Sequence, residues 1–161
     1  MFGNLLMKFY LRHIKQRGFR HGNNFNMEKG VNIDANFCNL ISVGNNVTLA
    51  KNVYILAHDA SMKKFLGKTK VAKVEVGNNV FVGAHTVILP GVKIGDDVVI
   101  GANSTVTKSI PKSEVWGGTP AKYIMETKDF LAKHEKYLGN NCVDKNELSI
   151  FLDKEMTAYI E

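Results

Sequence analysis

The 161-residue sequence has little that could tie the chain together covalently or hold a metal ion. It contains two cysteines, Cys38 and Cys142, and neither belongs to a CxxC pair or to a Cys/His pattern with the spacing of metal ligands. No N-terminal segment resembles a secretion signal, because Lys8 interrupts the one apolar run there. We therefore expect a cytoplasmic protein whose cysteines stay reduced.

A nucleic-acid-binding motif is also missing, although the formal net charge is +6. The lysines and arginines are spread along the chain, so we expect no nucleic-acid partner. One mixture of basic and apolar residues, from Leu5 to Arg20, predicts a short helix. We expect this helix to cap one end of the core fold, and contact with an anionic membrane surface is the alternative.

What the sequence does have is a six-residue period of aliphatic residues. The period runs through Val76, Val82, Ile88, Ile94, Ile100 and Val106. A helix cannot use it, because six steps of about 100° turn each successive aliphatic residue by about 240°. A strand can, since six is a multiple of two. This hexapeptide repeat predicts short parallel strands that coil around an aliphatic axis.

The same period appears upstream, and an interruption separates the two blocks. The upstream positions are Val31, Phe37, Val43, Leu49 and Ile55. The step from Ile55 to Val76 is three hexads plus three residues, so the period is broken between them. We therefore expect residues 59–73 to leave the coil as a loop, called the excursion loop below, directly after His58.

The fold class expected is an all-β core of hexapeptide repeats with helical segments at both ends. We expect an N-terminal helical segment over residues 1–24, the coil over residues 25–124 and a C-terminal helical extension over residues 125–161. Within the extension, the run from Thr127 to Tyr137 is rich in helix formers, and a second amphipathic stretch runs from Asp144 to Ile160.

Several motifs in and around the repeats resemble one known enzyme family. They are Ile55-Leu56-Ala57-His58-Asp59, Val76-Gly77-Asn78-Asn79-Val80-Phe81-Val82-Gly83-Ala84, Ile88-Leu89-Pro90-Gly91-Val92, Ile100-Gly101-Ala102, Val106-Thr107-Lys108 and Gly117-Gly118-Thr119-Pro120-Ala121-Lys122. The sequence resembles the hexapeptide-repeat acyltransferases, whose core is a left-handed parallel β-helix. Within them it is similar to galactoside and maltose O-acetyltransferases and to short enzymes that acetylate surface-polysaccharide sugars.

The resemblance implies an acetyl-CoA-dependent O-acetyltransferase. Its acceptor would be a sugar or a nucleotide- or lipid-linked sugar in surface-polysaccharide biosynthesis. His58 stands where the family has its general base, and a neutral imidazole can take the hydroxyl proton and return it to the leaving thiolate. Direct transfer is implied, with backbone N–H groups stabilising the oxyanion. The resemblance also implies a homotrimer with active sites between neighbouring coils.

Acetyl-CoA in this family lies along the groove between adjacent coils. Ala84 and Ala102 match its small-residue positions, and because they are three hexads apart we expect one to lie directly above the other. Phe81 stands where the family commonly has a tryptophan beside the thioester, and a core or groove phenylalanine is the alternative.

The polar end of the cofactor has counterparts further along the chain. Thr107, Lys108 and Lys122 match the family's contacts to it, with a solvated surface lysine as the alternative for each Lys. Met125 replaces a basic residue that the family usually has. Trp116 either covers the end of the coil or lines the nucleotide cleft.

The acceptor side is less well defined. Ala35-Asn36-Phe37 resembles an acceptor-binding segment, so Asn36 is a candidate substrate ligand, and a turn asparagine is the alternative. We expect His85 to line the cleft or cover a turn. An acidic acceptor contact of the family has no counterpart here, so galactoside specificity is not expected.

Three other functions remain open at the level of sequence. Amino-sugar N-acetylation would use the same base and groove. A γ-carbonic-anhydrase-like enzyme needs three histidine ligands for zinc, whereas the coil contains His58 and His85, and Pro90 stands where a further ligand is expected. A non-catalytic scaffold would not need a histidine beside the excursion loop. We expect no metal.

Overall fold

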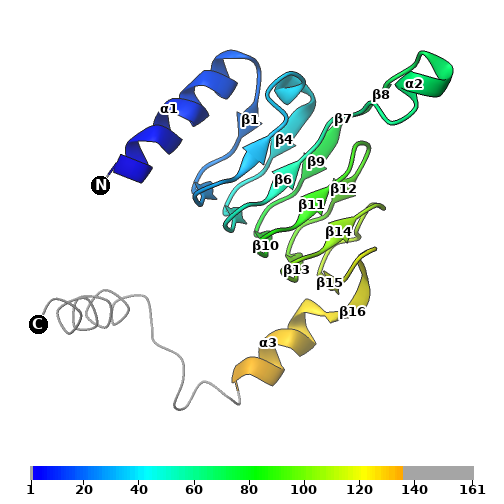
Figure 1. Cartoon of the computed structure of the whole chain (residues 1–161). Helices are drawn as coiled ribbons and strands as arrows, with labels where there is room; N and C mark the ends of the chain where they lie inside the picture. The colour runs from blue at the N-terminus through cyan, green and yellow to red at the C-terminus, as the bar shows by residue number, and fades with distance from the viewer. Residues whose placement is uncertain (1, 136–161) are drawn as a thin grey trace, which may run out of the picture. The chain divides into compact units, whose positions relative to one another are not determined.

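The computed structural model of the chain describes residues 2–135, with side chains from Leu6 onward (Figure 1). Most of its elements are short strands in parallel sheets. The helices of the described residues are α1 (Phe2–Gln16), the 3-10 helix η1 (Cys38–Leu40), α2 (Lys63–Leu66) and α3 (Thr127–Glu135). The chain divides into two compact units, Met1–Lys128 and Asp129–Glu161. The strands all belong to the first unit.

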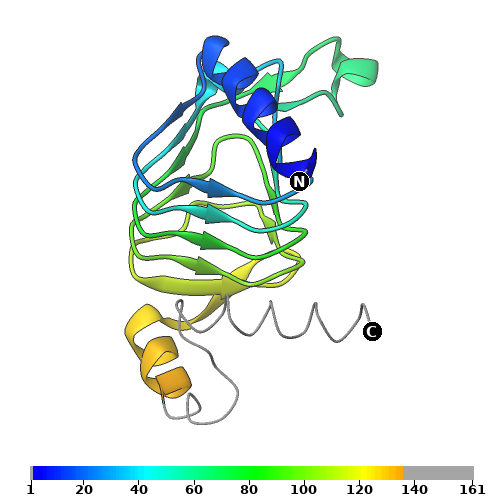
Figure 2. The same cartoon turned by 90° about the vertical axis from the view of Figure 1, so that its left-hand side faces the viewer.

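Successive strands join three sheets in turn, so the chain advances as a coil. The first sheet contains β1 (Arg20–His21), β4 (Ile41–Val43), β9 (Val74–Val76) and β12 (Lys93–Ile94). The second contains β2 (Asn26–Met27), β5 (Thr48–Leu49), β10 (Phe81–Val82), β13 (Val99–Ile100), β15 (Glu114–Gly117) and β16 (Lys122–Glu126). The third contains β3 (Asn32–Ile33), β6 (Tyr54–Ile55), β11 (Val87–Ile88) and β14 (Thr105–Val106). Figure 2 shows the strands stacked one coil upon the next.

Pairing within these sheets is parallel, except that β15 and β16 form an antiparallel hairpin at the last coil. Each coil has three corners, named here by the sheets they connect: the 1–2, 2–3 and 3–1 corners. The two-residue strands β3, β5, β6 and β10 to β14 each turn one aliphatic side chain inward, and Val82, Ile88 and Ile100 are fully buried. The six-residue period therefore fills a single axial core.

Asparagine and aspartate form the 1–2 corner. Asn46, Asn79 and Asp97 have φ angles of 55°, 54° and 59°, a left-handed conformation that Asn and Asp tolerate better than most residues. Their side chains stack as a ladder, in which Asn46 Nδ2 donates to Asn79 Oδ1 at 3.0 Å and Asn79 Nδ2 donates to Asp97 Oδ1 at 2.9 Å. The corner is thus held by side chains as well as by the strands.

The spacing between paired strands changes along the coil. Among β9 to β14 it is three hexads, as in the pairing of Glu75 with Lys93. Tyr54 pairs with Val87, and this separation exceeds three hexads by the length of the excursion loop. The coil therefore resumes its register after the loop.

The first coil is longer than the hexad count predicts. Asn32 pairs with Tyr54, a separation of three hexads plus four residues, and the extra residues lie at the 3–1 corner around η1. Ile33 consequently pairs with Ile55, whereas Phe37, which the period assigned to the core, is only half-buried. Of the two positions that the period assigned to the core upstream of Val43, Val31 is buried as predicted and Phe37 is not.

Helix α1 covers the end of the coil at which β1 lies (Figures 1 and 2). Ile14 is fully buried, and Met7 and Leu11 pack against the same core. The Tyr10 hydroxyl donates to Ile33 O at 2.9 Å and accepts from Ile33 N–H at 2.8 Å. Burial raises the pKa of Tyr10.

The strands begin earlier than the sequence suggested, because β1 lies inside residues 1–24, the segment expected to be helical. At the other end, α3 starts at Thr127, as the composition predicted. The Thr127 hydroxyl donates to Asp97 O at 2.7 Å, which fixes the start of the helix. The second amphipathic stretch, residues 144–160, and Cys142 lie outside the described residues. No helix among residues 2–135 is long and apolar enough to cross a membrane.

Candidate active site

A histidine and a buried aspartate meet at the 3–1 corner. His58 follows β6 and Asp34 follows β3, and because these strands pair in the third sheet their ends lie side by side. His58 Nδ1 contacts Asp34 Oδ2, which also accepts the Ala57 N–H at 3.1 Å. The Asp34 side chain is 4% exposed and that of His58 is 34% exposed. The pair thus consists of a buried carboxylate and an accessible imidazole.

This contact fixes which imidazole nitrogen carries the proton. An ionised carboxylate can only accept hydrogen bonds, so Nδ1 must be the donor. The remaining nitrogen, Nε2, then has a lone pair with which to take a proton from a substrate. The Phe37 ring lies against the imidazole, with a centroid separation of 4.9 Å, and limits its rotation. The arrangement suits general-base chemistry at a solvent-accessible corner.

The excursion loop leaves the coil directly at His58. Strand β7 (His58–Asp59) pairs antiparallel with β8 (Lys70–Val71), which closes the base of the loop. Asp59 Oδ1 accepts the Ser61 N–H at 2.8 Å, and hydrogen bonds from Ser61 lower the pKa of Asp59. The loop stem therefore starts with a fixed turn next to the histidine.

Three of the candidate cofactor residues share one pocket. Thr107, Lys108 and Lys122 line a cavity of about 210 Å³ near the end of the coil. Trp116 lines the same cavity, and its Nε1 donates to Glu114 Oε2 at 2.6 Å. Of the two positions open to Trp116 from the sequence, the structure therefore supports the lining of a cavity.

The small-residue pair lies at the 2–3 corner. Ala84 and Ala102 occupy equivalent places in adjacent coils, and Asn103 N–H donates to Ala84 O at 2.8 Å. Gly83 permits this close stacking, because a Cβ at that position would lie 2.7 Å from the Ala102 Cα. Phe81 precedes the corner on β10 and is exposed.

His85 belongs to this corner as well, and not to that of His58. It has a φ of 60°, and its Nε2 lies 3.3 Å from Asn52 Nδ2 in the adjacent coil. Its N–H donates to Lys51 O at 2.9 Å. His85 therefore occupies a turn of the 2–3 corner, and its side chain contacts Asn52 of the adjacent coil.

The candidate residues thus fall on two edges that border the third sheet. Asn36 is exposed two residues after Asp34, at the same corner as His58, and Thr107 and Lys108 follow β14 at that corner. Ala84 and His85 lie at the opposite border. Within residues 2–135 no three His, Cys, Asp or Glu side chains gather in an arrangement that could hold a metal ion.

Asp34 is the site residue that the sequence analysis missed. An acidic residue directly after the buried Ile33, in a coil otherwise filled by aliphatic side chains, was the available indication. It went unnoticed because the lengthened first coil does not align Asp34 with Leu56 when hexads are counted.

Comparison with known proteins agrees with this architecture. Residues 73–108 match the family described as "Bacterial transferase hexapeptide (six repeats)". Galactoside O-acetyltransferase of Escherichia coli (strain K12) is 40% identical over 121 residues, which are 69% of this chain and 58% of that protein. Protein CapG of Staphylococcus aureus is 40% identical over 121 residues, 70% of this chain and 69% of CapG.

A solved structure gives the same result. A galactoside acetyltransferase in complex with coenzyme A is 31% identical, with a TM-score of 0.59 over 73% of this chain and 69% of its own. The chain belongs to the hexapeptide-repeat acetyltransferase family. It is similar to the galactoside enzyme and to CapG, and it spans 58% of the length of both the E. coli relative and the putative acetyltransferase YvoF of Bacillus subtilis.

Proposed function

We propose that this protein transfers the acetyl group of acetyl-CoA to a hydroxyl group of a sugar, with His58 as the general base. The observation that carries the proposal is the contact of His58 Nδ1 with the buried Asp34 carboxylate at the base of the excursion loop. That contact leaves Nε2 as the proton acceptor on the accessible side of the ring. Relatives named galactoside and maltose O-acetyltransferases support the reaction and the sugar acceptor.

His58 acts first on the acceptor. Its Nε2 takes the proton of the sugar hydroxyl as the hydroxyl oxygen attacks the acetyl carbonyl carbon. The imidazole ring then becomes an imidazolium. Asp34 compensates this charge and keeps the ring oriented, while the Ala57 N–H fixes the carboxylate. His58 then returns the proton to the departing thiolate, so the base is regenerated without an acyl-enzyme. When bound, acetyl-CoA supplies the activated acetyl group.

The residues around the coil's last turn fit the polar end of this cosubstrate. Lys108 and Lys122 bring two positive charges to a cavity that also has an aromatic wall, Trp116. Phosphates need such charges, and an adenine ring can stack on an aromatic surface. The stacked Ala84 and Ala102 leave room along the 2–3 corner for an extended pantetheine arm, with Phe81 beside it.

His58 lies at the 3–1 corner, whereas Ala84 and Ala102 lie at the 2–3 corner. This separation within one chain supports an active site formed between two copies of the chain. We propose a left-handed β-helix that forms a homotrimer, in which the 3–1 corner of one copy faces the 2–3 corner of the next. A cleft between copies would bring His58 and Asn36 of one chain opposite Ala84 and Ala102 of its neighbour. The cytoplasm is the compartment in which acetyl-CoA is available, and we place the reaction there.

The relatives named galactoside and maltose O-acetyltransferases support a sugar as the acceptor. We propose a sugar hydroxyl on a precursor of a surface polysaccharide, bound beside the excursion loop with Asn36 as a hydrogen-bonding contact. The loop carries basic side chains, so a sugar linked to a phosphorylated carrier suits it electrostatically.

Thiol release from acetyl-CoA tests the proposal. Wild type, His58→Ala and the matched control His85→Ala are assayed against nucleotide sugars, simple glycosides and amino sugars. We expect turnover on hydroxyl acceptors that falls by about 10²–10⁴-fold in His58→Ala and is largely kept in His85→Ala. Turnover confined to amino groups would replace the O-acetyltransferase assignment with N-acetylation, and loss in His85→Ala alone would overturn the choice of base.

A further inference from the structure

Two basic segments without any acidic residue lie at the same end of the coil. Residues 1–27 contain no Asp or Glu, and neither do residues 60–73, most of the excursion loop. Their cations are Lys8, Arg12, Lys15, Arg17 and Arg20 in the first and Lys63, Lys64, Lys68, Lys70 and Lys73 in the second. The rest of the chain has 11 basic and 15 acidic residues. The positive net charge therefore comes from these two segments.

The fold brings the two segments to one end of the molecule. Helix α1 covers the first coil, and α2 at the tip of the excursion loop projects from the same end in both views (Figures 1 and 2). Charges that look dispersed in the sequence are therefore concentrated in space. The opposite end, formed by β15 and β16, carries charges of both signs, Glu114, Glu126 and Lys122.

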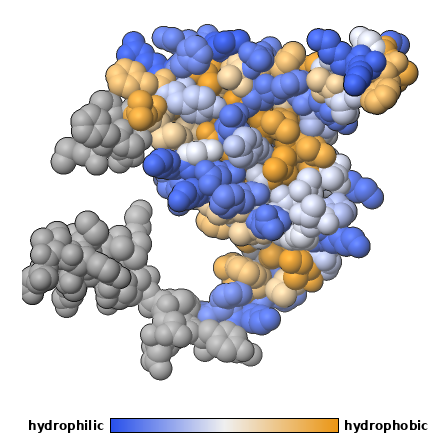
Figure 3. Space-filling model, in the orientation of Figure 1, coloured by the Kyte–Doolittle hydropathy of each residue, from blue (hydrophilic) through white to orange (hydrophobic). Residues whose placement is uncertain are grey.

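Both segments also expose large apolar side chains. On α1, Leu6 is 69% exposed and Phe9 59% exposed. In the excursion loop, Phe65 is 83% exposed and Leu66 is 64% exposed. Figure 3 shows hydrophobic and hydrophilic side chains next to each other over both segments. Large apolar side chains in water are unfavourable, so this combination calls for a partner.

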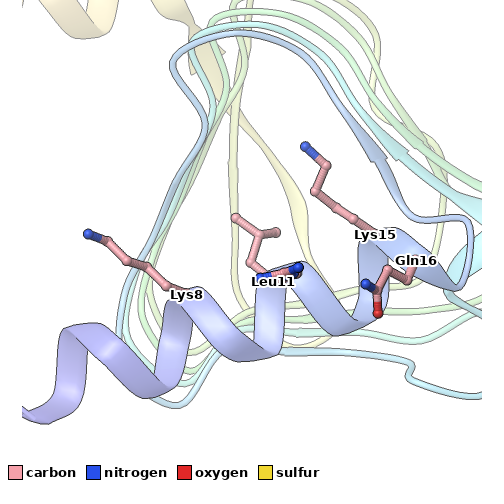
Figure 4. A pocket seen from close by; sticks show the side chains of 5 residues that line it. Lys8, Leu11, Lys15 and Gln16 are labelled. Atoms are coloured by element: carbon pink, nitrogen blue, oxygen red, sulfur yellow. The ribbon is translucent and has the colours of Figure 1, made fainter.

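Helix α1 has distinct faces. Met7, Tyr10 and Ile14 face the core. A second face forms an open hollow of about 550 Å³, lined by Lys8, Leu11, Arg12, Lys15 and Gln16 (Figure 4). Leu6 and Phe9 are exposed three residues apart, on neither the core face nor the hollow. Leu11 also packs against the core, whereas the cations of the hollow and the side chains of Leu6 and Phe9 are left available for binding.

We propose that this end of the coil docks on an anionic lipid surface. In this arrangement α1 lies in the plane of the interface, with Leu6 and Phe9 inserted at the headgroup boundary. The three cations of the hollow contact headgroup phosphates. Phe65 and Leu66 make the second contact, with the loop lysines around them. The proposal is independent of the reaction assigned above.

The positive charge and the exposed apolar side chains of this end of the coil together favour an anionic lipid surface over other partners. A second copy docking through the same end would set two acid-free positive surfaces against each other, which repels. A nucleic acid would explain the cations but would leave Phe9 and Phe65 without a role. An anionic membrane offers negative charge and an apolar layer at once, and this matches the interleaved side chains.

Vesicle co-sedimentation of the full chain tests the proposal. The probes are phosphatidylcholine vesicles with and without about 30% phosphatidylglycerol, at low and high salt. We expect wild type to bind the anionic vesicles at least about tenfold more tightly than the neutral ones and to be released by salt. Lys8→Glu with Arg12→Glu, and separately Leu6→Ser with Phe9→Ser, should each weaken this binding by about tenfold or more.

The matched control reverses two exposed lysines elsewhere, Lys112→Glu with Lys128→Glu, and should retain vesicle binding. Melting temperature and thiol release in solution should stay near wild type in all three double variants, which shows that they fold. Equal binding to neutral vesicles, or equal losses in the control variant, would overturn the proposal. So would an absence of vesicle binding accompanied by self-association that Leu6→Ser with Phe9→Ser abolishes, because the surface would then join copies of the chain.

Discussion

At the scale of single residues, the candidate site depends on a carboxylate that water barely reaches. Asp34 accepts hydrogen bonds from the Ala57 N–H and from His58, and both fix the carboxylate next to the ring. A buried charge without such partners would be costly, so the carboxylate and the imidazole stabilise each other. Their coupling makes the proton position on His58 a property of the pair.

Replacing Asp34 with asparagine should therefore impair His58 as a base. The amide oxygen of Asp34→Asn can still accept from the Ala57 N–H and from Nδ1, whereas the negative charge that compensates the imidazolium is lost, and an amide turned the other way would force the wrong tautomer. We expect kcat to fall by about 10²–10⁴-fold. The control is Asp97→Asn, where an amide oxygen can still accept from Asn79. Thiol-release assays of both variants decide the matter, and a kcat within about twofold of wild type for Asp34→Asn would contradict the assigned role.

Lys122 should affect cosubstrate binding rather than chemistry. It lines the cavity with Lys108 and Trp116, and His58 is not among the residues that line that cavity. Lys122→Ala is expected to raise the KM for acetyl-CoA by about tenfold, as loss of one phosphate contact would, and to leave kcat near wild type. The exposed Lys112→Ala serves as control. An unchanged KM for acetyl-CoA would make Lys122 an ordinary surface lysine.

Tyr10 should make stability depend on alkaline pH. Burial raises its pKa, so the folded state prefers the neutral phenol more strongly than the unfolded chain does. Its contribution is complete below the ordinary tyrosine pKa of about 10 and is lost as the pH rises above that value toward the raised pKa. Urea unfolding of wild type and Tyr10→Phe from neutral to alkaline pH measures this. The variant should be less stable by about 1–3 kcal/mol at neutral pH, with the difference shrinking above pH ~10. A constant difference would contradict the linkage.

At the scale of elements, α1 closes an end of the coil that would otherwise be open. Parallel strands β1, β2 and β3 have no further coil beyond them among the described residues, and α1 supplies the apolar cover through Ile14 and Met7. The first role of the helix is thus structural, because it covers the end of the coil.

Removing α1 should therefore expose apolar core side chains and unpaired strand edges through which copies of the chain can associate. Deletion of residues 2–16 uncovers core side chains and free strand edges, and we expect concentration-dependent association together with a lower melting temperature. Ile14→Ala, which keeps the helix but removes buried methyl groups, should cost about 2–5 kcal/mol without association. Light scattering and thermal melts distinguish the two. A deletion variant that stays monodisperse at wild-type stability would show that the coil needs no cap.

The hexad period predicted the elements well where the coil is regular and poorly where it is not. From β9 to β14 each predicted aliphatic residue is buried, because strands pair three hexads apart and the period matches the coil length. In the first coil, η1 adds residues at a corner, and a fixed period then assigns Phe37 to the core in place of Ile33. Insertions at corners change the phase without changing the composition, so the sequence alone did not reveal Asp34 next to His58.

At the scale of the whole molecule, the candidate residues lie on the two edges that border the third sheet. A complete active site would therefore need one edge from each of two neighbouring copies. If the cleft lies between copies, a His58→Ala chain retains an intact Ala84/Ala102 edge, and an Ala102→Trp chain retains an intact base. Co-expression of the two inactive variants should then restore thiol release to about a quarter of wild type, since one random pairing in four has both intact edges. Activity no higher than that of either variant alone would place the whole site within one chain.

The closed base of the excursion loop has a consequence for how such proteins diversify. His58 and Val71 pair across the stem formed by β7 and β8, and the coil regains its register at β9. The residues between β7 and β8 therefore need not pack into the core of the coil. Residues of the loop can be replaced or changed in number without disturbing the contact between His58 and Asp34. The fold thereby separates the proposed reaction centre from a neighbouring segment that tolerates variation.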